Sequence, residues 1–394
     1  MKQSAVALAI VFAALIGEST AVCPATKEES LKIILIGNSY TGGTSVGRAC
    51  DESAPSDCRS LAVPGNVAAS YNRDIYPGQW DFPPDQDTCI DPSSPYDAVT
   101  NTHRGDVPSK IRLLAEHICS GSTIDYVQNS QSAFSTRVHS GQSKTNYQDG
   151  TLHLLSSFAH DIVIVQPQSI EYLNGTTATR TSALQELLRP RDTANEGARY
   201  FVQQTWPKRE STVYNQICTT NGKKGVKKKG IIEEVNKTLQ GLVGVVSTPF
   251  DVVPTGDAFV HFAELACGPA LLGTQSNGKK QSQSCAFDDS HYCPMWWGEA
   301  GKISLFHEEV GIPGTHQSEE IGAWLSASVL YGVFQSTDAC YVSEDDLKSV
   351  MPRIDPKDLA DTPTGNSIHS IISEAARLAL SEKYGSAIPP CSNE

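Results

Sequence analysis

The chain has 394 residues, which is more than the usual single domain and enough for one large α/β domain with long insertions. Its formal net charge of −13 argues against a general electrostatic attraction to nucleic acid or to an anionic membrane. We therefore expect a substrate that is neutral or only locally charged.

The N-terminus has the pattern of an export signal. Lys2 precedes an apolar run over 5–16, and the small residues Ser19 and Ala21 suit signal peptidase. The run is shorter than the roughly 20 apolar residues of a membrane span. We predict a signal peptide over 1–21 and a single domain over 22–394, secreted and without a membrane span. The alternative is an uncleaved anchor helix.

The 11 cysteines of an exported chain predict a framework of disulfide bonds. Because the count is odd, at least one cysteine has no partner within the chain. No tight Cys-x-x-Cys couple is present, which argues against a structural zinc site, and no cofactor is expected. Asn174 and Asn236 each begin an Asn-x-Thr sequon, the acceptor pattern for N-glycosylation on a secretory route.

Short continuous apolar runs recur along the chain, and each ends in polar or turn residues, as strands buried on both faces do. Helical periodicity appears between them, at 108–118 and 230–242. The predicted strands are 32–36, 124–127, 161–165, 200–202 and 250–253. Strands and helices that alternate in this way predict a parallel sheet covered on both sides, with a ligand site beyond the carboxyl ends of its strands.

Three long segments interrupt this alternation, near 42–107, 206–229 and 268–310. Segments of this length in a compact domain are usually functional lids, and disulfides would keep them ordered. We interpret them as walls of a substrate cleft. Tryptophans in or beside these segments either face a sugar ring or acyl chain or pack in the core. They are Trp80, Trp206, Trp296 and Trp297.

A serine and a histidine stand where this architecture places a site. Ser39 follows the first strand directly, where its hydroxyl faces the cleft and nearby backbone N–H groups point at any anion beside it. His316 precedes a predicted helix over 319–334, whose positive end favours the neutral imidazole that a general base needs. Taken alone, an ordinary turn and a capping or surface histidine also explain these residues.

Three sequence blocks resemble the SGNH/GDSL hydrolase superfamily of serine esterases, in the branch that begins Gly-Asn-Ser. They are Lys32-Ile-Ile-Leu-Ile-Gly-Asn-Ser-Tyr-Thr41, Asp161-Ile-Val-Ile-Val-Gln-Pro-Gln-Ser169 and Gly314-Thr-His-Gln-Ser318 through Ala323-Trp-Leu-Ser-Ala-Ser328. The blocks occur in the order of the superfamily and span most of the mature chain. The resemblance implies a flavodoxin-like three-layer α/β/α sandwich with about five parallel strands and long disulfide-stapled insertions.

The resemblance also implies acyl transfer, with Ser39 as nucleophile and His316 as general base. The implied oxyanion hole consists of the Ser39 N–H, the backbone N–H of Ser132 or Ala133, and the side-chain amide of Gln166 or Gln168. Either glutamine amide has a strand-end structural hydrogen bond as its alternative role. Because the superfamily includes carbohydrate deacetylases and lipid esterases, the expected partner is a small ester or an acylated glycan, with an O-acetylated glycan favoured.

The chain departs from the superfamily at two places. Pro313 stands where an aspartate usually precedes the catalytic histidine by three residues. The acid that orients His316 would then be Glu308, Glu309 or Asp257, and a backbone carbonyl or a Ser-His dyad are further alternatives. A second departure is at the position where the superfamily has a glycine whose backbone N–H belongs to the oxyanion hole. Here Ser132 or Ala133 keeps that backbone donor but has a narrower range of backbone angles than glycine.

Two other functions fit the same sequence. A secreted binding protein that keeps the hydrolase fold without activity is favoured by Pro313. A metal-dependent hydrolase has candidate ligands but no recognised spacing. Those ligands are Asp288, Asp289, His291 and His307. Retention of Ser39 and His316 favours the esterase, and the oligomeric state does not follow from the sequence.

Overall fold

The computed structural model describes twenty stretches of the chain. They are 31–37, 69–71, 96–97, 102–103, 107–119, 124–130, 135–140, 151–157, 160–167, 177–190, 197–206, 220–221, 227–228, 231–268, 293–299, 301–306, 317–318, 320–334, 339–385 and 388–392. The predicted signal peptide and most of each predicted insertion lie outside these stretches.

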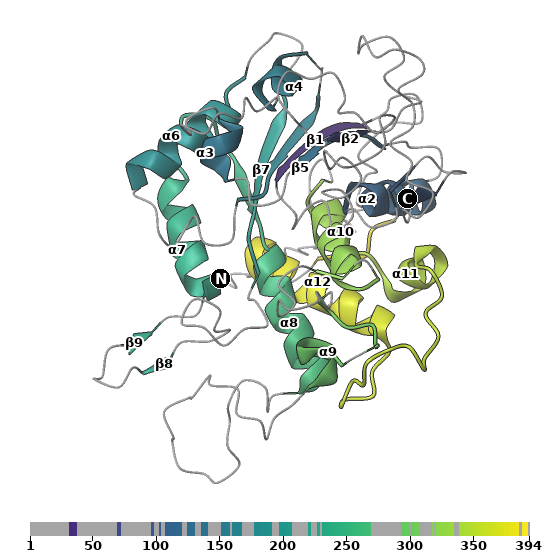
Figure 1. Cartoon of the computed structure of the whole chain (residues 1–394). Helices are drawn as coiled ribbons and strands as arrows, with labels where there is room; N and C mark the ends of the chain where they lie inside the picture. The colour runs from purple at the N-terminus through teal and green to yellow at the C-terminus, as the bar shows by residue number, and fades with distance from the viewer. Residues whose placement is uncertain are drawn as a thin grey trace, which may run out of the picture.

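A six-stranded sheet forms the centre of the protein (Figure 1). In sheet order its strands are β10 (Asp251–Val253), β7 (Arg199–Gln203), β6 (Ile162–Val165), β1 (Leu31–Gly37), β5 (Ile124–Ser130) and β2 (Ala69–Tyr71). The first five run parallel, which confirms all five predicted strands. Numbered along the chain, these five have the order 2-1-3-4-5 of flavodoxin-like sheets.

The sixth strand was not predicted. β2 joins the free edge of β5 in the antiparallel direction, and it is only three residues long. Two small antiparallel pairs also lack a sequence signal. They are β3 (Tyr96–Asp97) with β4 (Thr102–His103), and β8 (Thr220–Asn221) with β9 (Lys227–Lys228).

Helices cover both faces of the sheet (Figure 1). They are α2 (Val107–Ile118), α3 (Thr136–His139), α4 (Thr151–Ser157), α6 (Thr177–Leu187), α7 (Ile231–Leu242), α8 (Thr255–Cys267), α9 (Pro294–Trp297), α10 (Gly322–Val333), α11 (Glu344–Val350) and α12 (Ile368–Tyr384). The α2 and α7 helices confirm the predictions at 108–118 and 230–242. The α/β/α layering is as predicted.

Two hydrophobic cores lie on opposite faces of the sheet. Ile33 and Leu35 of β1 pack with α2, α8, α10 and α12, whereas Ile34 and Ile36 pack with α4, α6 and α7. Successive side chains of a strand point to opposite faces, so a strand covered on both faces needs apolar residues at every position. This explains why the sequence of β1 is apolar at every position from Ile33 to Ile36.

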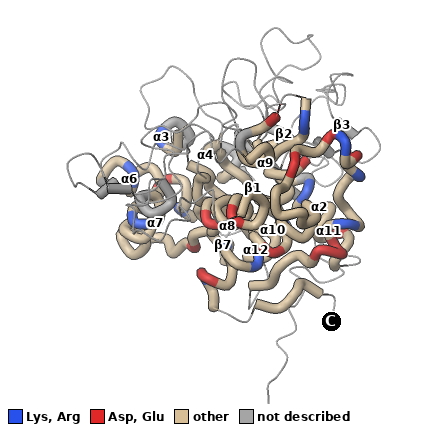
Figure 2. The backbone as a smooth tube through the Cα atoms, turned by 90° about the horizontal axis from the view of Figure 1, so that it is seen from below, with Lys and Arg blue, Asp and Glu red and all other residues tan. Residues whose placement is uncertain are grey.

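The α10 helix differs from its prediction. It begins at Gly322 instead of 319, and every one of its residues is buried. The spacing of Ile321, Leu325, Val329 and Val333, four residues apart, had indicated a helix with one apolar face. Neighbouring helices enclose it, because α2, α8 and α12 all pack against it. Figure 2 shows charged residues on outer helices such as α11, while the tube of α10 carries none.

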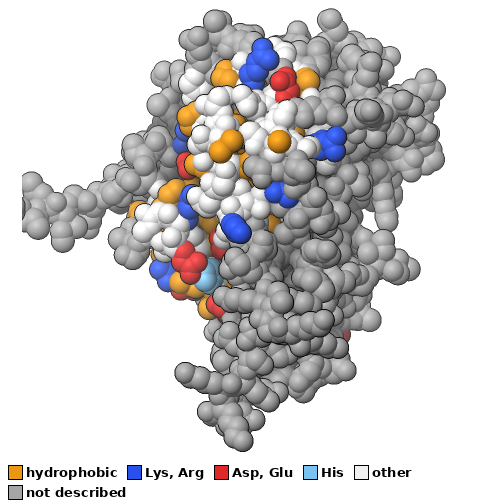
Figure 3. Space-filling view, turned by 90° about the vertical axis from the view of Figure 1, so that its left-hand side faces the viewer, with side chains coloured by type: hydrophobic (Ala, Val, Ile, Leu, Met, Phe, Trp, Pro, Cys, Tyr) orange, Lys and Arg blue, Asp and Glu red, His pale blue; other side chains and the backbone are white. Residues whose placement is uncertain are grey.

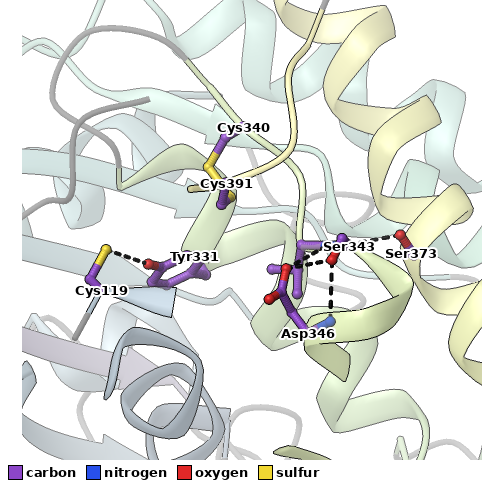
Figure 4. The surroundings of a disulfide bond; sticks show 8 residues. Cys119, Tyr331, Cys340, Ser343, Asp346, Ser373 and Cys391 are labelled. Carbon is purple, nitrogen blue, oxygen red and sulfur yellow. Dashed lines mark hydrogen bonds between the residues drawn. A yellow bond between two sulfur atoms is a disulfide. The ribbon is translucent and has the colours of Figure 1, made fainter. Parts of the chain in front are cut away.

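Two disulfides join segments at the ends of these helices. Cys267 pairs with Cys293, and Cys340 pairs with Cys391 across 51 residues. Figure 4 shows the second pair near Tyr331 of α10, whose hydroxyl lies 3.2 Å from the sulfur of the disulfide-bonded Cys119. All five cysteines in the described part of the chain are therefore in disulfides, as the cysteine count predicted. No helix among the described residues is long and apolar enough to cross a membrane.

Candidate active site

The strands that lead to the predicted nucleophile and oxyanion donors end side by side. In the register of the sheet, Gly37 at the end of β1 pairs with Ser130 at the end of β5. On the other side of β1, the Gln166 N–H donates to the Ile36 carbonyl at 2.7 Å. Because these strands are parallel, the segments that follow them begin at one edge of the sheet.

Most of the predicted residues on these segments lie outside the described residues. Ser39, Ser132, Ala133 and Gln168 follow the three strand ends within three residues, but the structure does not describe them. Gln166 is described and buried, and its side-chain amide donates to the Pro167 carbonyl at 2.6 Å. The structural hydrogen bond considered for Gln166 is thus present, and its role as an oxyanion donor stays a prediction.

The residues that flank the segment carrying His316 are paired with each other. Phe306 and Gln317 form an antiparallel bridge, so the described residues on either side of 307–316 pair with each other. The Ser318 N–H also donates to the Leu305 carbonyl at 2.9 Å. His316, Glu308 and Glu309 all belong to this ten-residue segment, which lies outside the described residues.

The α10 helix begins farther from His316 than the sequence predicted. The helix begins at Gly322, six residues after the histidine, and the Ser318 hydroxyl accepts hydrogen bonds from the Ile321 and Gly322 N–H groups at 3.2 Å each. The field of a helix end falls off within its first turn. The helix dipole therefore acts on His316 less directly than the sequence indicated.

Asp257, the third candidate for the orienting acid, lies in the first turn of α8 after the edge strand β10. Its Oδ2 accepts from the Gln204 Nε2 at 2.9 Å, its Oδ1 accepts from the Asn236 Nδ2 at 3.4 Å, and its own N–H donates to the Gln204 Oε1 at 3.1 Å. Burial raises the pKa of Asp257, and the bonds from Gln204 and Asn236 oppose that rise. This carboxylate is thus directed toward α7.

The same cluster includes one of the two predicted glycosylation sites. Asn236 is half-buried in α7, and the nitrogen to which a glycan would be attached is the donor to Asp257. A glycan at Asn236 would replace one of the two hydrogens on this nitrogen, next to the Asp257 carboxylate. Asn174 lies outside the described residues.

A group of polar side chains at the carboxyl ends of β7 and β10 was not among the predicted site residues. Gln203 Oε1, Thr205 Oγ1 and Thr255 Oγ1 are buried and, in the part of the chain that the structure describes, make no hydrogen bond. Unsatisfied buried groups are uncommon and mark places for a water or a polar ligand atom. The available signal was the polar run over 203–205, which directly follows a buried apolar strand.

Two of the candidate tryptophans pack in the core. Trp206 stacks on Phe259 with ring centroids 4.7 Å apart, and Trp296 meets Phe306 edge-on at 4.9 Å. Both tryptophans are fully buried, so they present no ring to a substrate. Trp80 and the side chain of Trp297 lie outside the described residues.

A shallow groove of about 490 Å³ runs along α6 to Val245, which precedes β10. No predicted site residue lines this groove. Among the described residues no group of three His, Cys, Asp or Glu side chains is placed to hold a metal ion. The candidate ligands of the metal-dependent alternative, Asp288, Asp289, His291 and His307, are not described.

The strand order and the grouping of these segments at one edge define a flavodoxin-like α/β/α architecture, the fold that the SGNH/GDSL resemblance implied. The sequence matches no family model and no curated protein.

Solved structures to which this chain is similar include a DUF4886 family protein from Bacteroides uniformis, with 11% identity, a TM-score of 0.45 and coverage of 91% of this chain and 97% of that chain. A proposed SGNH hydrolase from Slackia heliotrinireducens has 14% identity, a TM-score of 0.36 and coverage of 77% and 98%. A proposed GDSL-like lipase from Parabacteroides merdae has 12% identity, a TM-score of 0.37 and coverage of 77% and 95%.

Proposed function

We propose that this chain is a secreted serine esterase that hydrolyses carboxylic esters, with Ser39 as nucleophile and His316 as general base. The observation that carries the proposal is the arrangement of strand ends: Gly37 pairs with Ser130, and the Gln166 N–H bonds to Ile36. A nucleophile that follows β1 then has the predicted donor segments on both of its sides.

In the proposed mechanism, Ser39 Oγ attacks the ester carbonyl carbon while His316 takes the hydroxyl proton. The oxyanion is held by the Ser39 N–H, the N–H of Ser132 or Ala133, and the amide of Gln166 or Gln168. Collapse of the tetrahedral intermediate breaks the bond to the alcohol, which receives the proton from His316. Water then attacks the acyl-enzyme, gives its proton to His316, and releases the acid and the serine hydroxyl.

For the acid that orients His316 we favour Glu308 or Glu309 over Asp257. The bridge between Phe306 and Gln317 closes the segment that contains both glutamates and the histidine. Asp257, by contrast, already accepts hydrogen bonds from two amides on the side of α7. Glu308→Gln or Glu309→Gln should lower kcat, whereas Asp257→Asn should leave kcat per folded molecule near that of the wild type. A loss confined to Asp257→Asn would reverse this assignment.

Secretion and substrate class are parts of the same proposal. The disulfides in the described part of the chain support an oxidising compartment, where such bonds persist. An O-acetylated glycan remains the favoured substrate on the basis of the sequence resemblance, and the buried Trp206 and Trp296 add no support for it. We also propose glycosylation at Asn174 and at Asn236.

The decisive experiment measures hydrolysis of p-nitrophenyl acetate by the secreted protein. Ser39→Ala and His316→Ala should each lower kcat/KM by about 10³-fold or more, because both residues act in the same chemical step. Melting temperatures near that of the wild type would show that both variants fold. Wild-type protein without activity, or activity indifferent to Ser39, would favour the binding-protein alternative to which Pro313 points. Such a protein would retain an acetylated glycan without releasing acetate.

A further inference from the structure

The residue next to His316 is tied to the middle of α10. The Gln317 Oε1 accepts a hydrogen bond from the Ser326 hydroxyl at 2.5 Å, and both side chains are buried, at 2% and 0% exposure. A buried amide that loses its partner costs the full penalty of desolvation, so this bond specifies where Gln317 lies. Because Gln317 is also bridged to Phe306, its backbone and its side chain are both fixed.

The first turn of α10 fits closely over the same residue. A Cβ atom added to Gly322 would lie 2.6 Å from the Cβ of Gln317 and 2.6 Å from the Leu305 carbonyl oxygen. Contacts this short cannot persist, so any other residue at this position would push Gln317 or the Leu305 backbone away. The helix and the segment after His316 can meet this closely only with glycine at position 322.

The contacts continue into the rigid core. The Leu305 N–H donates to the Met295 carbonyl at 3.0 Å, and Met295 belongs to the short helix α9, which follows the disulfide-bonded Cys293. On the other side, the Ala323 N–H donates to the Ser318 carbonyl at 2.8 Å. The backbone that leaves His316 is therefore held between α9 and α10.

We propose that Ser326 and Gly322 are positioning residues for His316 and act through Gln317. This inference rests on the proposed function for its catalytic consequence. Neither residue touches substrate; each fixes the backbone from which the imidazole is presented to Ser39. Catalysis is sensitive to such placement, because an error of about 1 Å can cost about 10²-fold in rate.

A purely structural role would give Ser326 no special importance over another buried serine of α10. Ser328 supplies the matched control: it is also fully buried, but its hydroxyl donates to the Trp324 carbonyl of its own helix, at 2.8 Å. Ser326→Ala and Ser328→Ala each remove one buried hydroxyl from the same helix. Only the first removes a bond to Gln317.

The kinetic test compares these two variants in ester hydrolysis at matched folded concentration. Ser326→Ala should lower kcat by about tenfold with little change in KM, because a displaced base slows the chemical step more than binding. Ser328→Ala should keep the kcat of the wild type. Gly322→Ala should lower kcat further. Equal kcat values for Ser326→Ala and Ser328→Ala would overturn the proposal.

A second readout does not depend on esterase activity. Diethyl pyrocarbonate modifies accessible neutral imidazoles, and peptide mass spectrometry measures its rate at His316 alone. The rate at His316 should be several-fold higher in Ser326→Ala than in Ser328→Ala, because the histidine is less restrained. If Ser39→Ala keeps activity but this difference is seen, the proposed function fails while the positioning role stands. Equal modification rates in the two variants would refute the positioning role whatever the activity is.

Discussion

The two faces of the sheet are covered to different depths. On one face, α6 and α7 form a single layer, with exposed residues such as Val243 and Val245 beyond the end of α7. Figure 3 shows the side on which these helices lie, where hydrophobic and charged side chains are interspersed over the described surface. On the other face α12 packs over α8 and α10, and α10 has no exposed residue. The segment after His316 is attached to this thicker face.

The largest expected difference in stability between the two faces comes from the Cys340–Cys391 disulfide, which lies on the thicker face. Replacing Cys340 and Cys391 by alanine should lower the free energy of unfolding by about 4 kcal/mol, since the bond closes a long loop in the unfolded chain. The sequence separation of 51 residues sets that expectation. Urea denaturation of the two proteins measures it. An unchanged midpoint would mean that helix packing alone holds α11 and α12.

Substitution of one glycine on each face compares the packing of the two faces directly. A Cβ on Gly332 of α10 would lie 2.3 Å from the Cys340 carbonyl oxygen and 2.8 Å from Leu380 Cδ1, whereas a Cβ on the exposed Gly241 of α7 would meet nothing within 4 Å. Gly332→Ala should destabilise the protein by about 1–3 kcal/mol through overpacking. Gly241→Ala should stabilise it by about 0.4–1 kcal/mol, because it restricts the unfolded chain. Thermal melts of both variants test the pair, and similar shifts would contradict the difference in depth.

The smallest expected effect is dependent on pH and concerns the contact between α8 and α12. His261 lies 3.2 Å from Glu382 and 3.4 Å from Glu264. Burial lowers the pKa of His261, but the hydrogen bond that its ring donates to Glu264 and the charge of Glu382 together raise it above its ordinary 6.5. The histidine therefore contributes stability that is fully present below pH 6.5 and is lost as the pH rises through the raised value.

His261→Gln should consequently destabilise the protein near pH 6 by less than about 1 kcal/mol, since Glu382 is largely exposed to solvent. The difference from the wild type should vanish near pH 9, where the imidazole is neutral in both the folded and the unfolded state. Denaturation curves at the two pH values provide the test. A difference that grows with pH would show that the imidazole is buried in its neutral form.

The strands were predictable because each carries its own evidence. A run such as Ile33 to Ile36 is apolar at every position, and the two cores on opposite faces of the sheet require that pattern. The spacing of Ile321, Leu325, Val329 and Val333 indicated a helix correctly, but it could not show that neighbours would cover the remaining sides. The antiparallel strand β2 is three residues long and forms only against the edge of β5, so its local sequence contains no signal.

The site was predictable up to the strand ends and no further. That Ser39 follows β1 and Gln166 follows β6 is visible in the sequence, because a buried strand ends where polar residues begin. The contact of Gly322 with Gln317 and Leu305 depends on how distant segments meet, and a glycine that opens a helix has no distinctive pattern. Asn236 shows the same limit, since a three-residue sequon does not reveal that Asp257 accepts from its amide.

The Cys340–Cys391 bond also determines how the protein would carry a mechanical load. Tension applied to the chain beyond Cys391 passes through the two sulfur atoms to Cys340 and from there toward the end of α10. The 341–390 segment, which includes α11 and α12, is bypassed and stays slack while the bond is intact. A steady pull would therefore act first on the buried helix, and this load would extend α12 only after reduction of the bond.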